Sequence, residues 1–254
     1  AQDIVENIGA GLKNALETSR SFLGVEAGDY EYPIIRPEYL ATVKIAENLT
    51  GPDVTVRLEA RMSKLTDDAR KLKKFADLFK SQKRIKTNCC NSNPKRNDAK
   101  RIDILVSSSD TPPVPILVCE VKLGLNKVNG LKKDIDRLIA ILETYSNHGL
   151  LDQHRMYGAV VFHTMHEGVQ TDEAQTTTEK YRKILENHCK SRAEKLPWLN
   201  YNVCSIKRSQ LSEPVCGEEV IHDDGNVEKV FCRDQYAFIP GLILLGNAND
   251  IVAL

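Results

Sequence analysis

Residues 101–123 read RIDILVSSSDTPPVPILVCEVKL, in which two apolar runs flank a polar stretch rich in serine and proline. The runs have the lengths of β-strands, and the turn residues between them predict a hairpin with a loose connection. Each run also carries charged side chains among its apolar ones: Asp103 in the first, Glu120 and Lys122 in the second. Because a buried charge is unfavourable without a partner or a metal ion, we expect the chemistry of the protein at these residues.

The second run indicates a strand that is covered on both sides. In an extended chain alternate side chains point to opposite faces, so Glu120 and Lys122 share a face with Val118. Both faces are apolar up to position 120, which is typical of a strand between two layers. When the two runs pair as a hairpin, Asp103 and Glu120 converge on one point, with Lys122 one residue pair further on.

Two carboxylates that converge in this way form, with water or phosphate oxygens, a site suited to Mg²⁺, which takes oxygen ligands. A lysine beside them can orient or help to deprotonate a water molecule, and it can stabilise negative charge that develops on a phosphate. A structural alternative is also open. In it, Glu120 and Lys122 form an ion pair at a strand end, and Asp103 caps a turn.

Hydrophobic periodicity predicts the remaining elements, and it is clearest at 128–145, where Leu131, Ile135, Leu138 and Leu142 recur at steps of three and four. Helices are predicted at 3–20, 37–49, 66–83, 128–145 and 172–195, strands at 53–60, 156–163, 201–207 and 236–245, and a polar loop at 88–100. This order predicts an α/β (α+β) fold with a mixed central sheet flanked by helices. No linker is evident, so we expect a single domain over 1–254.

The composition is that of an ordinary globular protein of 254 residues, 41% hydrophobic and 28% charged. Lys and Arg number 35, as do Asp and Glu, so no overall basic field points to a nucleic-acid partner. The charges are segregated, however: 70–101 holds twelve Lys and Arg against two acids, and 213–234 holds seven acids against two basic residues. A polyanion would dock on the first segment and be repelled by the second. The alternative is a solvated helix face beside an acidic loop.

The chain shows no signal for a membrane or for export. Its longest apolar stretches, 114–119 and 237–245, are shorter than the ~18 residues of a membrane helix, so we expect no membrane partner. The first residues place acids where a secretory signal has basic residues, and the missing initiator methionine indicates a trimmed chain. Seven cysteines without a CxxC pair indicate reduced thiols and predict a cytoplasmic protein.

The segments Arg101-Ile-Asp103-Ile-Leu and Val118-Cys-Glu120-Val-Lys122, with sixteen residues between the two acids, resemble the motif of the PD-(D/E)XK (restriction-endonuclease-like) nuclease superfamily. Isoleucine stands before Asp103, where the motif's name has proline. In that superfamily the order is helix, strand, acid-bearing strand, ExK-bearing strand, helix and strand. The resemblance therefore implies a restriction-endonuclease-like core at about 37–164, interrupted by a basic helix at 66–83, with an N-terminal helix at 1–25 and a C-terminal elaboration at 165–254.

The resemblance also implies roles for individual residues. Asp103 and Glu120 would be catalytic residues that bind Mg²⁺, which Mn²⁺ can replace, and Lys122 would stand at the nucleophilic water. The first helix of the superfamily often carries a further metal-linked acid. In RPEYLATVKIAENL this role falls to Glu38, with Glu47 as the alternative.

The function implied is that of a metal-dependent endonuclease that hydrolyses DNA phosphodiester bonds in restriction, defence, repair or as an effector. RNA remains open as a substrate, and a homodimer is expected because cleavage of a duplex usually needs two active sites. The alternative is a non-catalytic member of the fold that binds nucleic acid or protein. The residues expected to contact the nucleic-acid backbone are Lys73, Lys74, Lys83, Arg84, Lys95, Arg96, Lys100, Arg101, Lys132 and Lys133, the last two beside Asp134 in GLKKDIDRL.

Overall fold

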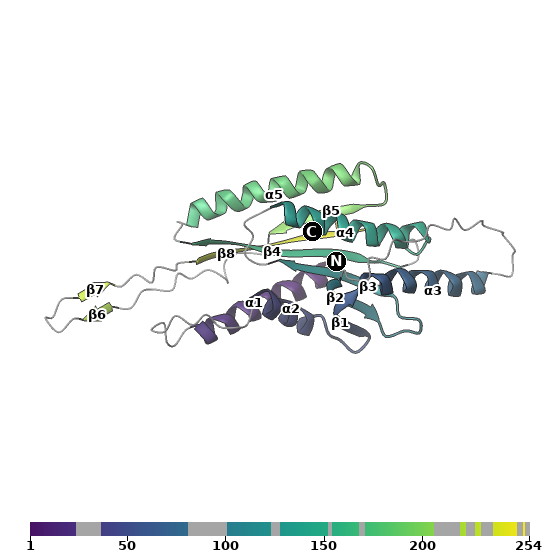
Figure 1. The fold of residues 1–254 in the computed structure, drawn as a ribbon, viewed down its shortest axis with the longest axis horizontal. Helices are drawn as coiled ribbons and strands as arrows, with labels where there is room; N and C mark the ends of the chain where they lie inside the picture. Colours follow the sequence, from purple (N-terminus) through teal and green to yellow (C-terminus); the bar gives the residue numbers. More distant parts are fainter. Residues whose placement is uncertain are drawn as a thin grey trace.

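The structure is a computed structural model that describes residues 1–23, 37–80, 101–122, 128–151, 154–167, 171–205, 219–221, 227–229, 236–247 and 251. The helices are α1 (Gln2–Leu23), α2 (Pro37–Asn48), α3 (Met62–Lys80), α4 (Val128–Asn147) and α5 (Thr171–Ala193). The strands are β1 (Val54–Arg61), β2 (Arg101–Ser108), β3 (Pro115–Lys122), β4 (Tyr157–Glu167), β5 (Asn200–Ser205), β6 (Glu219–Ile221), β7 (Val227–Lys229) and β8 (Tyr236–Gly246). The predicted α/β class, with a mixed central sheet flanked by helices, is confirmed (Figure 1).

Six strands form the central sheet in the order β1-β2-β3-β4-β8-β5. β3 and β4 run parallel, because α4 carries the chain from one to the other, and every other neighbouring pair is antiparallel. β8 lies between β4 and β5, so the last long strand of the sequence lies inside the sheet. β6 and β7 pair only with each other among the described strands, and the sequence did not predict either of them.

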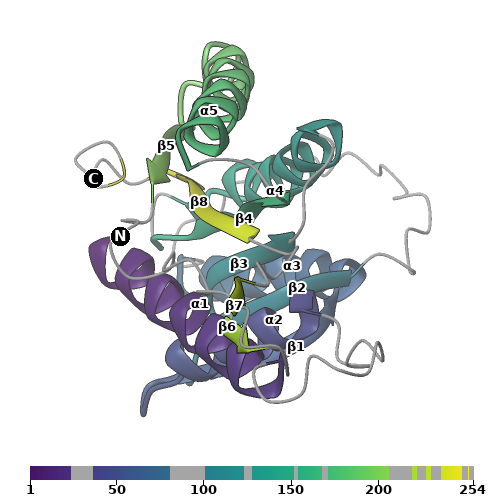
Figure 2. The same ribbon diagram turned by 90° about the vertical axis from the view of Figure 1, so that its left-hand side faces the viewer.

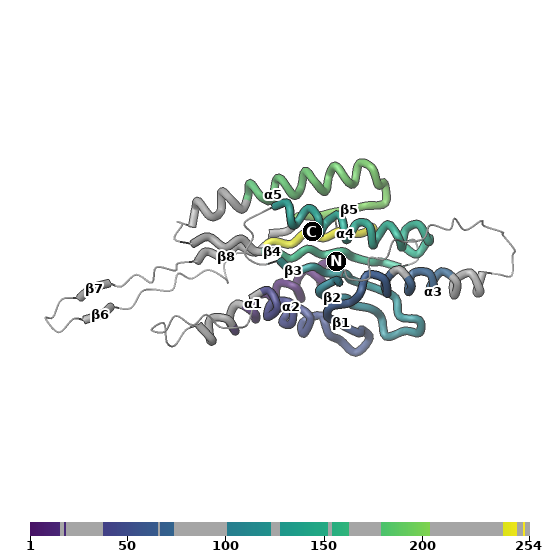
Figure 3. The backbone as a smooth tube through the Cα atoms, in the orientation of Figure 1, coloured from purple at the N-terminus to yellow at the C-terminus, as the bar shows by residue number. Residues whose placement is uncertain are grey.

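The helices lie in two layers with the sheet between them (Figure 2). α1 and α2 pack on one face, while α4 and α5 cover the other, with α3 beside α4. Figure 3 traces the same separation of α1 and α2 from α4 and α5. Val118 packs in the core under α4, and Leu117, Cys119 and Val121 pack in the core under α1 and α2. The prediction that this strand is covered on both faces is therefore confirmed.

The helix predicted at 66–83 begins earlier than expected. α3 starts at Met62, immediately after β1 ends at Arg61, and its buried stripe begins with Leu65 and continues through Ala69 and Leu72. The spacing of three and four residues thus starts one residue before the predicted helix, and the chain turns from strand to helix without a loop. Tyr145 of α4 donates a hydrogen bond to the Leu65 carbonyl oxygen at 2.9 Å, which ties the two helices together. The predicted loop at 88–100 lies outside the described residues.

None of the helices, over the part of the chain that the structure describes, has the length and apolar character needed to cross a membrane.

Gly241 of β8 is required where β8 meets β4. It lies directly opposite Phe162, and a Cβ atom there would stand 2.4 Å from the end of that ring, which is only 2% exposed. Because the ring is packed and has no free space to move into, we expect Gly241→Ala to lower the free energy of unfolding by about 1–3 kcal/mol.

Gly130, in the first turns of α4, is the matched control, since a Cβ atom there meets nothing within 4 Å. Gly130→Ala should leave stability unchanged or raise it by up to about 1 kcal/mol. Urea denaturation of both variants measures the difference. A Gly241→Ala protein as stable as the wild type would contradict the packing of β4 on β8.

Candidate active site

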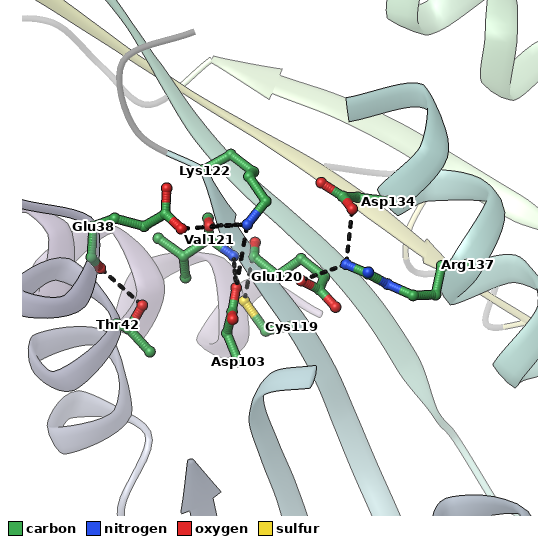
Figure 4. Close-up of polar contacts among 9 residues, drawn as sticks. All are labelled: Glu38, Thr42, Asp103, Cys119, Glu120, Val121, Lys122, Asp134 and Arg137. Carbon is green, nitrogen blue, oxygen red and sulfur yellow. Dashed lines mark hydrogen bonds and ion pairs between the residues drawn. The ribbon is translucent and has the colours of Figure 1, made fainter. Parts of the chain in front are cut away.

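The β2–β3 hairpin brings Asp103 beside the end of β3. Ile104 pairs with Cys119 across the antiparallel hairpin, so Asp103, the residue before Ile104 on β2, lies alongside the residues that follow Cys119. The Asp103 carboxylate accepts a hydrogen bond from the backbone N–H of Val121, with Oδ2 at 2.8 Å from the nitrogen (Figure 4). This bond to the neighbouring strand fixes the carboxylate at the end of the sheet where Lys122 emerges.

Lys122 links this strand end to helix α2. Its Nζ lies 3.3 Å from Glu38 Oε1 and 4.0 Å from Asp103 Oδ2. It also donates a hydrogen bond to the Val121 carbonyl oxygen at 3.2 Å. Burial alone would lower the pKa of Lys122, but the carboxylates of Asp103 and Glu38 outweigh it and the pKa is raised. Lys122 is therefore a charged donor near neutral pH.

Helix α2 supplies one acid to the site. Pro37 is its first residue, as suits a position where the backbone N–H is not needed, and Glu38 follows in the first turn. The Thr42 hydroxyl donates to the Glu38 carbonyl oxygen at 2.8 Å within the helix. Glu47, the alternative acid, is exposed and pairs with Lys44 at 2.9 Å. Of the two acids named from the sequence, the structure brings Glu38 to Lys122.

Glu120 faces the opposite layer from Glu38 and is almost completely buried, with 1% of the residue exposed. Its Oε2 lies 2.7 Å from Nη2 of Arg137 on α4, and the same nitrogen lies 2.7 Å from Asp134 Oδ1 (Figure 4). The structural alternative from the sequence is wrong in detail. Lys122 forms its ion pairs with Glu38 and Asp103 rather than with Glu120, and Asp103 binds the neighbouring strand rather than capping a turn.

The Glu120 and Asp134 carboxylates that bind Arg137 differ in their electrostatics from the acids of a surface ion pair. Burial, reinforced by the nearby Asp103 carboxylate, raises the pKa of Glu120 to about 8, although Arg137 opposes the shift. Burial also raises the pKa of Asp134. The two groups thus hold protons more firmly than exposed acids do, and a cation that binds Glu120 must displace a proton at neutral pH.

Arg137 was missed by the sequence analysis, although a signal was present. The apolar stripe of α4 includes Leu131, Ile135 and Leu138, and Asp134 lies on that same stripe, three residues after Leu131. A charged residue on the buried face of a helix needs a partner, and Arg137 follows at the i+3 spacing that places it alongside. Asp134 was instead grouped with the two lysines that precede it.

The predicted nucleic-acid contacts are only partly within the described residues. Lys133 is exposed and Lys132 half-buried near the start of α4, and Lys73 is half-buried on α3. Arg101, at the start of β2, forms an ion pair with Glu59 of β1, with Nη1 3.7 Å from Oε2. Lys74 belongs to α3, but its side chain is outside the description, and so are the residues Lys83, Arg84, Lys95, Arg96 and Lys100.

The residues present fit a cation that uses few protein ligands. As the side chains stand, the described residues contain no group of three or more His, Cys, Asp or Glu that could hold a metal ion. Mg²⁺, however, commonly uses one or two carboxylates and takes its other ligands from water and phosphate. Glu120 Oε1 is buried and has no hydrogen-bond partner among the described residues. A buried carboxylate oxygen in that condition is the chemical feature that a cation would satisfy.

Four carboxylates surround two cationic groups in this cluster. Glu38, Asp103, Glu120 and Asp134 all act on Lys122, and Arg137 acts on the last two. When every group is ionised, the cluster carries an excess of two negative charges, which one divalent cation neutralises.

No family model, curated protein or solved structure matches this chain.

The raised pKa of Glu120 predicts a pH-dependent stability difference between the wild type and Glu120→Gln. Below about pH 4.5 the Glu120 carboxyl is protonated in both the folded and the unfolded states, so its full contribution to the free energy of unfolding is present. As the pH rises towards about 8, the unfolded chain loses this proton and the folded chain keeps it. The wild type should lose up to about 1.4 kcal/mol per pH unit relative to the glutamine variant.

Urea denaturation of both proteins between pH 4.5 and pH 8 measures this difference. Glu47→Gln, which removes an exposed carboxylate, is the control for the loss of a charge alone. A difference that stays constant across this range would contradict the raised pKa.

Proposed function

We propose that the protein is a metal-dependent endonuclease of the PD-(D/E)XK type that hydrolyses phosphodiester bonds of DNA. The observation that carries the proposal is the position of Lys122, whose Nζ lies 3.3 Å from Glu38 and 4.0 Å from Asp103. These three residues come from α2, β2 and β3, and Glu120 is two residues before the lysine on β3. A lysine held among carboxylates from separate elements is the arrangement that the sequence resemblance implies.

The order of the elements supports the same proposal. The chain runs α2, β1, β2, β3, α4, β4, with α3 inserted after β1, and β3 and β4 are the parallel pair. This is the order of helix and strands that the resemblance to the superfamily implies. The C-terminal segment adds β8 and β5 to the far side of the same sheet, away from β2.

Asp103 and Glu120 would hold Mg²⁺ or Mn²⁺, with Glu38 as the accessory acid. A bound cation would act as a Lewis acid that stabilises charge on the phosphate. Lys122, kept charged by its two carboxylates, would donate hydrogen bonds that orient the attacking water and stabilise charge on a phosphate oxygen. It would not take up the water's proton. The Glu38 carboxylate, whose side chain is 44% exposed, is the group open to solvent that would accept it.

Two lysines of α4 support nucleic acid as the substrate. Lys132 and Lys133 lie near the start of α4, on the helix that bears Arg137, where they would contact phosphates. Such contacts position a duplex without reading its sequence, and they would also accept RNA. Two copies of the chain would supply one active site for each strand of a duplex.

Cys119 and Cys189 are free thiols, which supports a reducing compartment such as the cytoplasm.

Cleavage of supercoiled plasmid with Mg²⁺, Mn²⁺ or EDTA tests the proposal. We expect metal-dependent cutting by the wild type and none by Asp103→Asn or Glu120→Gln, because each removes a ligand charge. Lys122→Ala should lower the rate by about 10²-fold or more. Glu38→Gln should also lower it, whereas Glu47→Gln, the matched control on the same helix, should cut like the wild type.

Circular dichroism and thermal unfolding establish that each variant is folded. Folded Asp103→Asn and Glu120→Gln proteins that cut as well as the wild type would contradict the site. A folded wild type that cuts neither DNA nor RNA with either metal would favour the non-catalytic member of the fold that binds nucleic acid or protein.

Binding by the start of α4 is tested with the double variant Lys132→Ala/Lys133→Ala. If both side chains contact phosphates, affinity for duplex DNA should fall for every sequence. The slope of log affinity against log salt concentration should also decrease by about 1 to 2. Lys180→Ala/Lys183→Ala, on the exposed surface of α5, is the control. Fluorescence anisotropy over a salt series measures both slopes, and equal slopes for the two double variants would exclude a contact at α4.

A further inference from the structure

The contact between Glu120 and Arg137 leaves one atom of each partner unsatisfied. Arg137 Nη2 lies 2.7 Å from Glu120 Oε2, but the second oxygen, Oε1, is buried without a hydrogen-bond partner among the described residues. The Nε atom of Arg137 is buried in the same condition. Buried polar groups are nearly always hydrogen-bonded, so an unpaired oxygen on a residue that is 1% exposed requires an explanation.

A second arginine, on the neighbouring helix α5, shows how a structural ion pair is built in this protein. Arg192 of α5 binds Asp136 of α4 through two parallel bonds, Nε to Oδ1 and Nη2 to Oδ2, each 2.8 Å long. His188 adds a third contact to Oδ1 at 2.9 Å. This two-pronged geometry, the usual one for arginine and a carboxylate, satisfies both oxygens of the acid. The Glu120–Arg137 contact uses only one oxygen.

Asp134 contacts the same guanidinium. The Nη2 atom that binds Glu120 also binds Asp134 Oδ1 at 2.7 Å. This nitrogen carries two hydrogens, and the two carboxylates share it. Asp134, 7% exposed and three residues before Arg137 on α4, holds the guanidinium from the helix side. The arginine therefore bridges the two acids through Nη2, and its Nε donates to neither of them.

We propose that Arg137, held by Asp134, is a positioning residue that fixes Glu120 by Oε2 and leaves Oε1 as the atom that binds the divalent cation. The inference rests on the proposed metal-dependent function and assigns to it two residues of α4 that do not themselves touch the substrate. Groups that orient a metal ligand in this way commonly change metal affinity by about 10- to 100-fold when they are removed. A purely structural ion pair would change stability instead.

The test is the binding of Mn²⁺ to the full chain without nucleic acid, measured by the electron paramagnetic resonance signal of free Mn²⁺. We expect Arg137→Ala to raise the dissociation constant for Mn²⁺ by about 10- to 100-fold. Asp134→Asn, which keeps the size of the side chain, should raise it in the same direction. Arg192→Ala, which removes the two-pronged pair to Asp136, should bind Mn²⁺ like the wild type even where it lowers the melting temperature.

Circular dichroism identifies the folded variants, and Asp134→Asn provides the test if Arg137→Ala does not fold. Unchanged Mn²⁺ affinity in the folded variants would overturn the positioning role. Tighter binding would overturn it as well, because it would mean that the guanidinium competes with the cation. A wild type that binds no Mn²⁺ would instead overturn the proposed function, and the inference with it.

Discussion

The burial of Glu120 is the constraint on which the rest of the site depends. Its carboxylate lies on β3, inside a sheet covered on both faces, and an ionised carboxylate there is unfavourable unless positive charge or hydrogen bonds compensate it. Arg137 provides a counter-charge from α4, and Asp134 holds Arg137 in place. The pKa of about 8 shows that this compensation is incomplete, which is expected if a cation completes the site.

Three separate elements must meet for the site to exist. The hairpin places Asp103 against the backbone of Val121, α2 carries Glu38 to Lys122, and the α4 crossover carries Arg137 to Glu120. The two helices come from opposite layers, so the end of β3 is contacted from both faces of the sheet. β3 lies between β2 and β4, away from either edge of the sheet, and β8 and β5 extend the sheet beyond β4. The fold thus contributes to the site by burying β3 as much as by supplying side chains.

The sequence predicted the parts of this arrangement that follow from local patterns. The two-residue period of β3 places Glu120 and Val121 on opposite faces of the sheet, and the hairpin sets Asp103 beside them. The period and the hairpin are both readable from the sequence of 101–123. The preference for Glu38 over Glu47 came from the resemblance and not from local patterns, because both acids lie on one helix and only tertiary packing decides which of them reaches Lys122.

Arg137 was overlooked because periodicity was read from apolar residues, whereas the decisive position on the stripe of α4 is a charged one, Asp134. The insertion of β8 between β4 and β5 depends on strand pairing between distant parts of the chain, which no local pattern encodes.

The measurement that tests the metal site most directly is anomalous diffraction from crystals of the protein soaked in Mn²⁺. A site formed by these residues predicts an anomalous peak in contact with carboxylate oxygens of both Asp103 and Glu120, with Arg137 still bound to Glu120 Oε2. Full density for both side chains with no anomalous peak between them, or a peak only at other residues, would contradict it.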